Sequence, residues 1–543
     1  MDEEGDVDEC MEEEWGDDNF WKGPKVRDHC HWTGVYRGVA HADCNWKYHA
    51  TKKVPVIFHN LSGYDGHIIF QDIHKMDNLK IEPIAKTLEK FISFKWIDPN
   101  VSWKLEFKDS LNFLGSSLDK LVKNLKIAAE ADKSQTEYFK HTRAYFKNEW
   151  GHLPDSAFNM LLRKGCYPYR YVDSLERLEE KHIPPKEAFY NDLSEEGISD
   201  TDYDFVKEVW ETFKINNLKQ YHDLYMCTDV MLLTDVFEYF RSQSLKHYKL
   251  DPAHFNTAPG LSWAAALKHT NVTLQVLVDP NKIMFIDKGM KGGAAYGRNP
   301  ILTANNPMID SFDPNKTISW MLLLDANNLY GFAMRQYLPY GNFKWIHNNN
   351  LTSDDIMKMG DEDDKGYFLE VDLEYPTNIH NLHDQYPLAP DHIKIDENML
   401  SEFQKNLAKD LGTKSGGNKL GLTLYNKKNY ICHYRNLKQY LSLGMKLTKV
   451  HRVLEFSQSP WLRSYIDLNT ELRQKANSKS EEELPKLMNN SFFGKTCEDT
   501  KKYKDIQVFI GSDDKVIKSL QKVQNRPQFH RVKLYNDSLG LFR

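Results

Sequence analysis

The stretch Trp320-Met-Leu-Leu-Leu-Asp325-Ala-Asn-Asn-Leu-Tyr330-Gly331 joins an apolar run to one carboxylate and then to a polar turn. Residues 318–324 predict a fully buried strand, because strands covered on both faces are apolar at almost every position. A carboxylate at the end of such a strand, here Asp325, can hold a divalent cation. Two-metal phosphoryl transfer needs carboxylates that bridge two Mg²⁺ ions about 4 Å apart. The alternative is an Asp that caps the following helix.

A second stretch, Lys486-Leu-Met-Asn-Asn490-Ser-Phe-Phe-Gly494, has a regular spacing. Lys486, Asn490 and Gly494 recur every four residues, so a helix would present them on one face. Lys486 can neutralise a triphosphate, and Gly494, which lacks a Cβ atom, lets a base pair approach the backbone. The alternative for Gly494 is the C-cap of the helix.

The two stretches resemble the first palm motif and the fingers motif of family B DNA polymerases, Asp-x-x-Ser-Leu-Tyr-Pro and Lys-x-x-x-Asn-Ser-x-Tyr-Gly. Asn328 and Gly331 stand at the Ser and Pro positions of the first motif, and Phe493 stands at the Tyr position of the second. The resemblance implies that Asp325 is a catalytic Mg²⁺ ligand and that Tyr330 packs under the sugar and excludes ribose. The dNTP-binding residues implied in this way are Tyr330, Lys486, Asn490 and Gly494.

Two stretches of the first half resemble motifs of the 3′-5′ exonuclease domain of the same polymerases. His59-Asn60-Leu-Ser-Gly-Tyr64-Asp65 is similar to the second exonuclease motif, and Tyr225-Met-Cys-Thr-Asp229 is similar to the third. The resemblance implies that Asp65 and Asp229 bind metal, that Tyr225 orients the attacking water, and that Asn60 and Tyr64 contact single-stranded DNA. A core tyrosine and a capping Asp are the alternatives.

Two shorter stretches are less specific. Ser117-Leu118-Asp-Lys-Leu121 resembles the motif with which these enzymes contact single-stranded DNA, although an ordinary amphipathic helix starts in the same way. Lys291-Gly292-Gly293 resembles the Tyr-x-Gly-Gly/Ala linker between exonuclease and polymerase, with Lys291 in place of Tyr. A flexible turn is the alternative. The DNA-binding residues implied here are Ser117, Leu118, Gly292 and Gly293.

One carboxylate-bearing motif of each active site is missing from its expected place. The palm Asp-Thr-Asp does not follow the fingers motif, and the Asp-x-Glu of the first exonuclease motif does not precede the His/Cys-rich segment. Asp200-Thr-Asp202 is interpreted as a helix cap, and Asp372-Leu-Glu374 as part of a strand between the polymerase motifs. We therefore expect a fragment with an incomplete Mg²⁺ ligand set. The alternative function is a catalytically inactive nucleic-acid-binding remnant.

A His/Cys-rich segment, residues 28–45, resembles the core of recombination endonuclease of the phage His-Asn-His type. A structural zinc site needs four ligands, and the plausible ones here are Cys10, His41 and Cys44. Three alternatives stay open: a zinc-binding insert, a metal-dependent endonuclease-like module, or a metal-free remnant. The seven cysteines are odd in number and dispersed, which argues against a disulfide framework.

Charge is distributed unevenly along the 543 residues, whose net charge is −6. Residues 1–18 carry eleven acids and no base. Residues 414–463 carry ten Lys and Arg against one acid, Glu455, with four tyrosines interspersed. This composition is suited to a phosphate backbone. A solvated helical face with core tyrosines is the alternative.

The expected fold class is α/β and α+β multidomain, and the resemblance implies an RNase H-like exonuclease domain followed by a partial right-hand domain of palm and fingers. The expected segments are an acidic and His/Cys-rich lead (1–53), an exonuclease-like domain (54–283), a Gly-rich linker (284–300), and a truncated palm and fingers (301–543). No run approaches the roughly 18 apolar residues of a membrane span, so we expect an intracellular protein without a membrane partner.

The resemblance is closest to protein-primed polymerases of Maverick or Polinton type transposons. It implies DNA-directed DNA synthesis in DNA replication, with primer-template DNA and dNTPs as ligands. It also implies a terminal protein that supplies the priming hydroxyl, and a nuclear, viral or transposon replication site.

Overall fold

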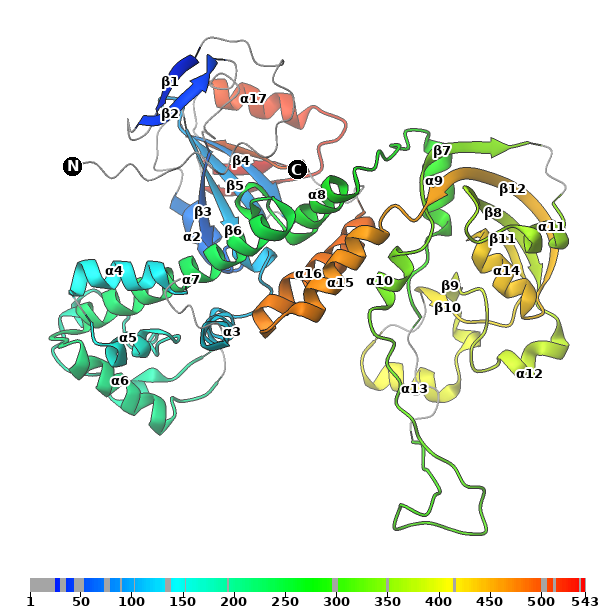
Figure 1. Ribbon diagram of the computed structural model, residues 1–543, viewed down its shortest axis with the longest axis horizontal. Helices are drawn as coiled ribbons and strands as arrows, with labels where there is room; N and C mark the ends of the chain where they lie inside the picture. Colours follow the sequence, from blue (N-terminus) through cyan, green and yellow to red (C-terminus); the bar gives the residue numbers. More distant parts are fainter. Residues whose placement is uncertain are drawn as a thin grey trace. The chain divides into compact units, whose positions relative to one another are not determined.

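The computed structural model describes residues 25–29, 36–42, 53–72, 79–87, 90–101, 103–131, 138–151, 153–192, 195–294, 301–347, 351–413, 417–499, 505–510, 514–536 and 539–542. The chain forms two compact units (Figure 1). Unit 1 comprises Met1–Ser242, Asp251–Ala258 and Glu498–Arg543, and unit 2 comprises Gln243–Leu250 and Pro259–Cys497. This division differs from the expected segments, because it assigns residues 259–283 to unit 2 and residues 498–543 to unit 1.

Unit 1 contains a four-stranded mixed sheet in the order β3-β6-β5-β4. β3 runs parallel to β6, and the other neighbours are antiparallel. Its core is aromatic, with Phe94 stacked on Phe107 and set edge-on to Phe70. The apolar run at residues 54–58 lies in β3, which is exposed to half-buried because it is an edge strand of this sheet. The elements are β3 (Lys53–Phe58), α2 (Asp65–Asp72), β4 (Lys80–Ala85), β5 (Phe91–Ile97) and β6 (Lys104–Asp109).

After this sheet, the chain of unit 1 continues into a group of α-helices. Asp235 of α7 accepts hydrogen bonds from the first backbone N–H groups of α4, at His141 (3.0 Å) and Thr142 (2.8 Å), where a helix favours negative charge. Ser199 caps α6, so Asp200 and Asp202 lie in the first turn of a helix, as expected for a cap region. The helices are α3 (Leu118–Ala131), α4 (Lys140–Trp150), α5 (Asp155–Leu161), α6 (Asp200–Thr212) and α7 (Leu218–Tyr248).

The remaining elements of unit 1 come from both ends of the chain. Ile506 packs into the aromatic core beside Phe91 and Phe94, which joins the C-terminal segment to unit 1. The elements are the hairpin β1 (Lys25–His29) and β2 (Tyr36–His41), then β13 (Gln507–Ile510), α17 (Asp514–Gln524), β14 (Val532–Asn536) and β15 (Leu539–Phe542). No helix of the described ranges is both long and apolar enough to cross a membrane.

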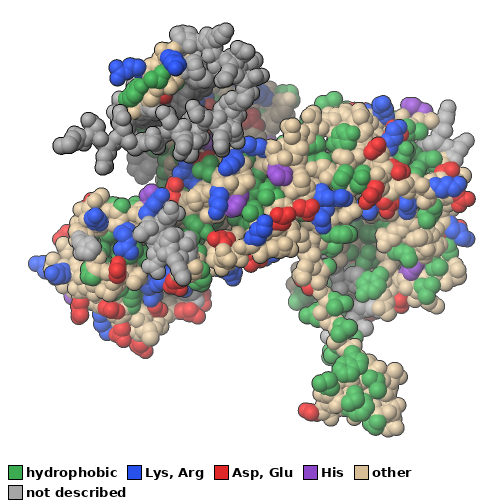
Figure 2. All heavy atoms as spheres, in the orientation of Figure 1, with side chains coloured by type: hydrophobic (Ala, Val, Ile, Leu, Met, Phe, Trp, Pro, Cys, Tyr) green, Lys and Arg blue, Asp and Glu red, His purple; other side chains and the backbone are tan. Residues whose placement is uncertain are grey.

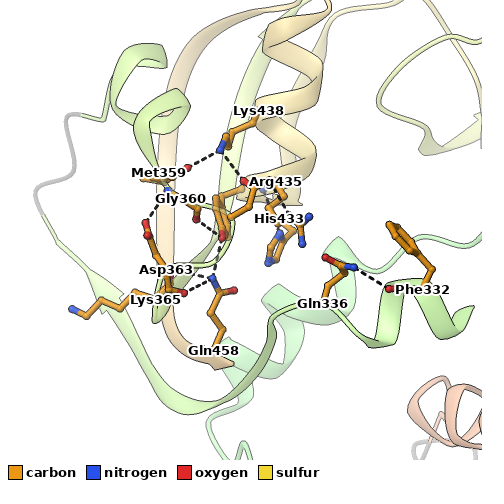
Figure 3. A network of polar contacts seen from close by, with 12 residues as sticks. Phe332, Gln336, Met359, Gly360, Asp363, Lys365, His433, Arg435, Lys438 and Gln458 are labelled. Carbon is orange, nitrogen blue, oxygen red and sulfur yellow. Dashed lines mark hydrogen bonds and ion pairs between the residues drawn. The ribbon is translucent and has the colours of Figure 1, made fainter. Parts of the chain in front are cut away.

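Unit 2 contains an antiparallel sheet in the order β11-β8-β12-β7. Gln458 of β12 donates to the Tyr434 hydroxyl (2.9 Å), and Tyr434 donates to the carbonyl of Gly360 (2.9 Å), which ties the loop before β8 to the sheet (Figure 3). The elements are β7 (Leu338–Ile346), α11 (Ser353–Lys358), β8 (Lys365–Glu374), α12 (His380–His383), β9 (Asp391–Ile395), α13 (Glu402–Asp410), β10 (Gly417–Gly421), β11 (Lys427–His433), α14 (Tyr434–Ser442) and β12 (Lys446–Ser459).

Five helices complete unit 2: α8 (Ala258–Thr270), α9 (Pro280–Gly289), α10 (Leu329–Met334), α15 (Arg463–Lys475) and α16 (Lys479–Thr496). Trp263 of α8 stacks on Phe492 of α16 at 5.2 Å between ring centroids. The polar composition of residues 477–483 predicts an exposed loop, but residues 479–483 are helical. Ser478 accepts from the Glu481 N–H (3.3 Å) and starts α16 at Lys479, because a serine N-cap favours helix over loop.

The fully buried strand expected at residues 318–324 is absent. These residues form no strand and lie on a long loop of unit 2 (Figure 1). Leu322, Leu323 and Leu324 are 81%, 101% and 86% exposed. Figure 2 shows hydrophobic side chains gathered on this projecting loop. A strand needs a hydrogen-bonded neighbour, and in the described residues the segment has only the isolated bridge between Ser319 and Asn305.

Candidate nucleotide-binding site

A hollow of about 470 Å³ in unit 2 brings both polymerase-like stretches together. Tyr330 comes from α10, and Lys486 and Asn490 come from α16. Two residues that the motifs did not indicate also contribute, Arg473 of α15 and Asn489 of α16. The complete lining is Ala326, Asn327, Asn328, Leu329, Tyr330, Arg473, Lys486, Asn489 and Asn490.

Helix α16 presents the expected face. Lys486 and Asn490 are exposed and one helical turn apart, so both side chains reach the same hollow. Gly494 lies inside the helix, and Cys497 is the C-cap, so the alternative of Gly494 as the C-cap is wrong. A Cβ atom at Gly494 would meet nothing within 4 Å, which leaves the backbone approachable at this position.

The aromatic ring of Tyr330 is held by Phe493. The two rings stack with centroids 3.9 Å apart and planes inclined by 10°. Phe493 therefore fills the Tyr position of the fingers motif with a ring that supports Tyr330. At the start of α10, Asn328 adopts a left-handed conformation (φ 54°) and folds its carboxamide against Gly331. A Cβ atom at Gly331 would meet this carboxamide, so any other residue there would require the Asn328 side chain to move.

Two cations with different surroundings line the hollow. Lys486 is exposed. Arg473 donates from Nη2 to Glu482 Oε1 (3.0 Å), which keeps the guanidinium against α16. Its Nε atom is buried and has no hydrogen-bond partner among the described residues. An unpaired buried donor costs free energy, so Arg473 favours a ligand that brings an acceptor.

Asp325 directly precedes the first lining residue, Ala326, and is exposed to solvent. The part of the chain that the structure describes contains no group of three or more His, Cys, Asp or Glu placed to hold a metal ion. Asp325 thus neighbours a lining residue in sequence, but the strand expected before it is absent and the described residues do not form a two-metal ligand set.

In unit 1, Asp109 organises the loop that carries the second exonuclease-like motif. Its carboxylate accepts from the backbone N–H groups of Asn60 (2.8 Å) and Ser62 (3.2 Å). Asn60 has a positive φ of 74°, which asparagine tolerates better than most residues. Tyr64 is 67% exposed, and Asp65 begins α2. Asn60 and Tyr64 are therefore presented by a loop that Asp109 holds in place.

The third exonuclease-like motif lies on α7. Tyr225 and Asp229 interact with each other, and Lys164 pairs with Asp229 Oδ2 at 3.5 Å. Burial raises the pKa of Asp229, while Lys164 and Tyr225 oppose the rise. Oδ1 of Asp229 is buried without a hydrogen-bond partner among the described residues, so this carboxylate can accept a cation or a donor. The Tyr225 hydroxyl also bonds to that of Tyr169 (2.5 Å).

The charge of Lys164 also affects His59, which lies in the loop after β3. Burial is the main cause that lowers the pKa of His59, and Lys164 adds to the lowering. Lys164 therefore lies near both exonuclease-like motifs, although no contact joins Asp65 to Asp229 in the described residues. The sequence interpretation missed Lys164 and Tyr169. Both residues lie more than fifty positions from Tyr225 in the sequence, so no helical or strand periodicity connects them with it.

The two less specific stretches occupy contrasting environments. Ser117 is exposed at the start of α3, whereas Leu118 is buried in the helical core of unit 1. Gly292 and Gly293 are exposed, and a Cβ atom on either would meet nothing within 4 Å. Lys291 is anchored: Nζ donates to the Ile431 carbonyl (3.2 Å) and lies 4.1 Å from the Tyr430 ring centroid.

The suggested zinc ligands lie outside the part of the chain whose side chains the structure describes. Cys10 and Cys44 lie outside the described residues, and His41 ends β2 with a side chain that is also outside them. The zinc and endonuclease interpretations therefore stay predictions.

Two of the ten bases between residues 414 and 463 pair with acids from another strand. On β12, Arg452 pairs with Glu370 (2.6 Å), and Lys446 lies 3.5 Å from Glu374. These acids belong to β8, which the count along the sequence did not include. Three of the four tyrosines are buried in the core, and only Tyr425 is exposed. The structure thus supports the alternative of core tyrosines for Tyr430, Tyr434 and Tyr440.

The hollow is thus lined by a lysine, an arginine, four asparagine carboxamides and an aromatic ring supported by Phe493, a combination that suits an anionic ligand. The model of the family described as "DNA polymerase type B, organellar and viral" matches residues 153–529, which is more than half of the chain. The chain belongs to this family. No curated protein sequence matches it.

Solved structures with a similar fold are those of Phi29 DNA polymerase. The orthorhombic crystal form matches with a TM-score of 0.41 and 14% identity, over 85% of this chain and 63% of that chain. The ternary complex with primer-template DNA and incoming nucleotide substrates matches with a TM-score of 0.43 and 14% identity, over 84% of this chain and 62% of that chain. The chain thus spans less than two thirds of the length of these structures.

Proposed function

We propose that this chain is the nucleotide-binding part of a DNA-directed DNA polymerase, which performs template-directed nucleotidyl transfer in DNA replication. One observation carries the proposal: Tyr330, Lys486 and Asn490 come from two distant motifs and line one hollow together with Arg473. Family membership supports the same activity.

Each lining residue has a role in this proposal. Lys486 and Arg473 neutralise the triphosphate, Arg473 with a planar fork that suits phosphate oxygens. Tyr330, supported by Phe493, packs under the sugar, and Asn490 donates to the nucleotide. Phosphoryl transfer depends mainly on positioning and charge stabilisation, which these groups supply. Polymerases of this kind use divalent cations such as Mg²⁺, for which Asp325 is a proposed ligand.

We extend the proposal to the partners that the family resemblance implies. Primer-template DNA is the macromolecular ligand, and a terminal protein supplies the priming hydroxyl at a replication site inside the cell. A 3′-5′ exonuclease-like function is the second candidate, and the unpartnered Oδ1 of Asp229 beside Tyr225 and Lys164 favours it. In that function Asn60, Tyr64, Ser117, Gly292 and Gly293 contact DNA, and Asp65 contributes a second carboxylate.

The experiment that tests the main proposal does not require catalysis. A primer-template with a dideoxy-terminated primer is mixed with the chain, and each dNTP is titrated in the presence of Mg²⁺. The expected result is that the complementary dNTP stabilises the protein–DNA complex in a gel-shift assay and that the other three do not. Lys486→Ala should weaken this effect about 10- to 100-fold, because charge-assisted hydrogen bonds contribute about 1.5–3 kcal/mol.

The control is Lys479→Ala, which removes a lysine of the same helix that does not line the hollow. Equal stabilisation by all four dNTPs, or by none, would overturn template-directed nucleotide binding. DNA binding without any dNTP effect would instead support the inactive nucleic-acid-binding remnant. Primer extension that Asp325→Asn abolishes would add catalysis to nucleotide binding.

A further inference from the structure

A chain of buried polar side chains ends at the floor of the hollow. Tyr248 of α7 donates to Asn469 Oδ1 (2.7 Å), and Asn469 Nδ2 donates to Asn489 Oδ1 (2.7 Å). All three side chains are buried, and Asn469 is 0% exposed. All three residues belong to unit 2. Burying a polar group costs free energy unless it is hydrogen-bonded, so this hydrogen-bonded series favours one arrangement of the three side chains.

The direction of these hydrogen bonds determines which atom Asn489 can offer to a ligand. A tyrosine hydroxyl that donates to Asn469 must face its carbonyl oxygen, so the amide nitrogen of Asn469 faces Asn489. That nitrogen can only donate, and the oxygen of Asn489 therefore accepts from it. The remaining polar group of Asn489 is its own Nδ2. Asn489 thus presents a donor and not an acceptor.

Asn489 occupies a favourable position for such a donor. It lines the hollow, and it lies on α16 three residues after Lys486 and directly before Asn490. The helical spacing of three and four residues turns all three side chains toward the same region. The exposed Lys486 and Asn490 form the rim, whereas Asn489, 3% exposed, lies at the floor.

We propose that Asn489 contacts the bound nucleotide by donating from Nδ2 to an acceptor oxygen, and that Tyr248 and Asn469 are positioning residues that orient its carboxamide. The inference rests on the proposed function and deepens it. The helix thereby contributes a second amide donor beside Asn490. The orientation of this donor is set by α7 and α15 and not by α16 alone.

The test measures the dissociation constant of the complementary dNTP for the complex with dideoxy-terminated primer-template. Asn489→Leu, which has a similar volume and no donor, should weaken binding about tenfold. Tyr248→Phe removes the hydroxyl that orients Asn469 and should weaken binding about threefold. Asn489→Asp should bind poorly at pH 8 and recover as the pH falls toward 5, because a protonated carboxyl regains an O–H donor.

Ser244→Ala is the matched control. Ser244 of α7 is fully buried and donates to the Leu250 carbonyl (2.8 Å), which is not part of the series that ends at Asn489. It should lower the denaturation midpoint without changing the dNTP dissociation constant. Unchanged dNTP binding in both Asn489→Leu and Tyr248→Phe would overturn this inference alone. Absence of dNTP binding by the unsubstituted chain would overturn the inference together with the proposed function.

Discussion

His433 shows how a single residue acquires its properties from its neighbours. It ends β11 and caps α14, where Nδ1 accepts from the Arg435 N–H (3.3 Å). Its ring lies against Phe368, Tyr434 and Phe456. Burial lowers the pKa of His433 to about 4, and the charge of Arg435 adds to the lowering. The side chain is therefore neutral in the folded chain at neutral pH.

This pKa predicts a pH dependence of stability. Unfolded histidine titrates near pH 6.5, so unfolding takes up a proton between about pH 6.5 and 4. The contribution of His433 is fully present above pH 6.5 and is lost as the pH falls through this window, by about 1–3 kcal/mol. His433→Asn keeps an acceptor for the cap and should remove this part of the loss. Urea unfolding at pH 7 and pH 4.5 measures the difference, and equal losses in both proteins would contradict the prediction.

The hairpin of α15 and α16 is the element on which the hollow depends. Only residues 476–478 join the two helices, so they pack as antiparallel neighbours and bring Arg473 to Lys486. Arg473 also pairs with Glu482 in the first turn of α16. The position of both cations thus depends on where α16 begins.

Removal of the α16 cap should lower stability. Ser478→Ala deletes the side chain that accepts from the Glu481 N–H. Such caps contribute about 1 kcal/mol, so the free energy of unfolding should fall by about that amount. Ser480→Ala, inside the first turn, is the control and should change it by less than about 0.5 kcal/mol. Urea denaturation of both variants decides, and equal effects would exclude a specific role for the cap.

The charge pairs between β8 and β12 predict a weak contribution of this sheet to DNA binding. Lys446 and Arg452 already face Glu374 and Glu370, so neither needs a phosphate as counter-ion. Lys446→Gln and Arg452→Gln should each change the slope of log affinity against log salt by less than about 0.5. A lysine that contacts phosphate contributes about 0.9 to that slope. A decrease of that size in filter-binding titrations would show that the basic stretch contacts DNA.

The sequence patterns predicted the secondary structure within one segment better than the contacts between segments that are distant in the sequence. The four-residue spacing of Lys486, Asn490 and Gly494 identified a real helix, because helical periodicity is a property of one segment. The sequence did not indicate Arg473, because its place at the hollow depends on the packing of α15 against α16. It did not indicate Asn489, because that side chain is held by a buried hydrogen bond from Asn469. Residues 318–324 were assigned wrongly as a strand, since an apolar composition does not supply the hydrogen-bonded neighbour that a strand requires.

For the whole molecule, the mixed α/β character and the family were predictable, whereas the composition of the units was not. Residues 498–543 follow the fingers-like helix in sequence but belong to unit 1. Their association depends on Ile506, Val508 and Ile510, which pack against the aromatic cluster of the first sheet. No pattern within this segment reveals that its neighbours lie some four hundred residues earlier.

The exposed leucines of the loop should affect solution behaviour more than folding. Leu322, Leu323 and Leu324 make an apolar run open to solvent, and such runs promote association. Replacing Leu323 by Asp should change the free energy of unfolding by less than about 0.5 kcal/mol and reduce concentration-dependent association. Leu373→Asp, in the buried core of β8, should prevent folding. Light scattering and urea denaturation measure both effects, and strong destabilisation by Leu323→Asp would show that the loop is buried in solution.

The Arg473–Glu482 pair has a consequence for which anions the hollow selects. In the ligand-free chain the guanidinium already has a carboxylate as counter-ion, so a nucleotide exchanges one anionic partner for another. A single phosphate gains little from that exchange, because it would replace an ion pair of similar strength. A triphosphate can reach Arg473 and Lys486 at once, which favours nucleoside triphosphates over monophosphates and free phosphate. The Glu482 carboxylate thereby weakens the binding of short anions and favours a ligand with enough phosphates to contact both Arg473 and Lys486.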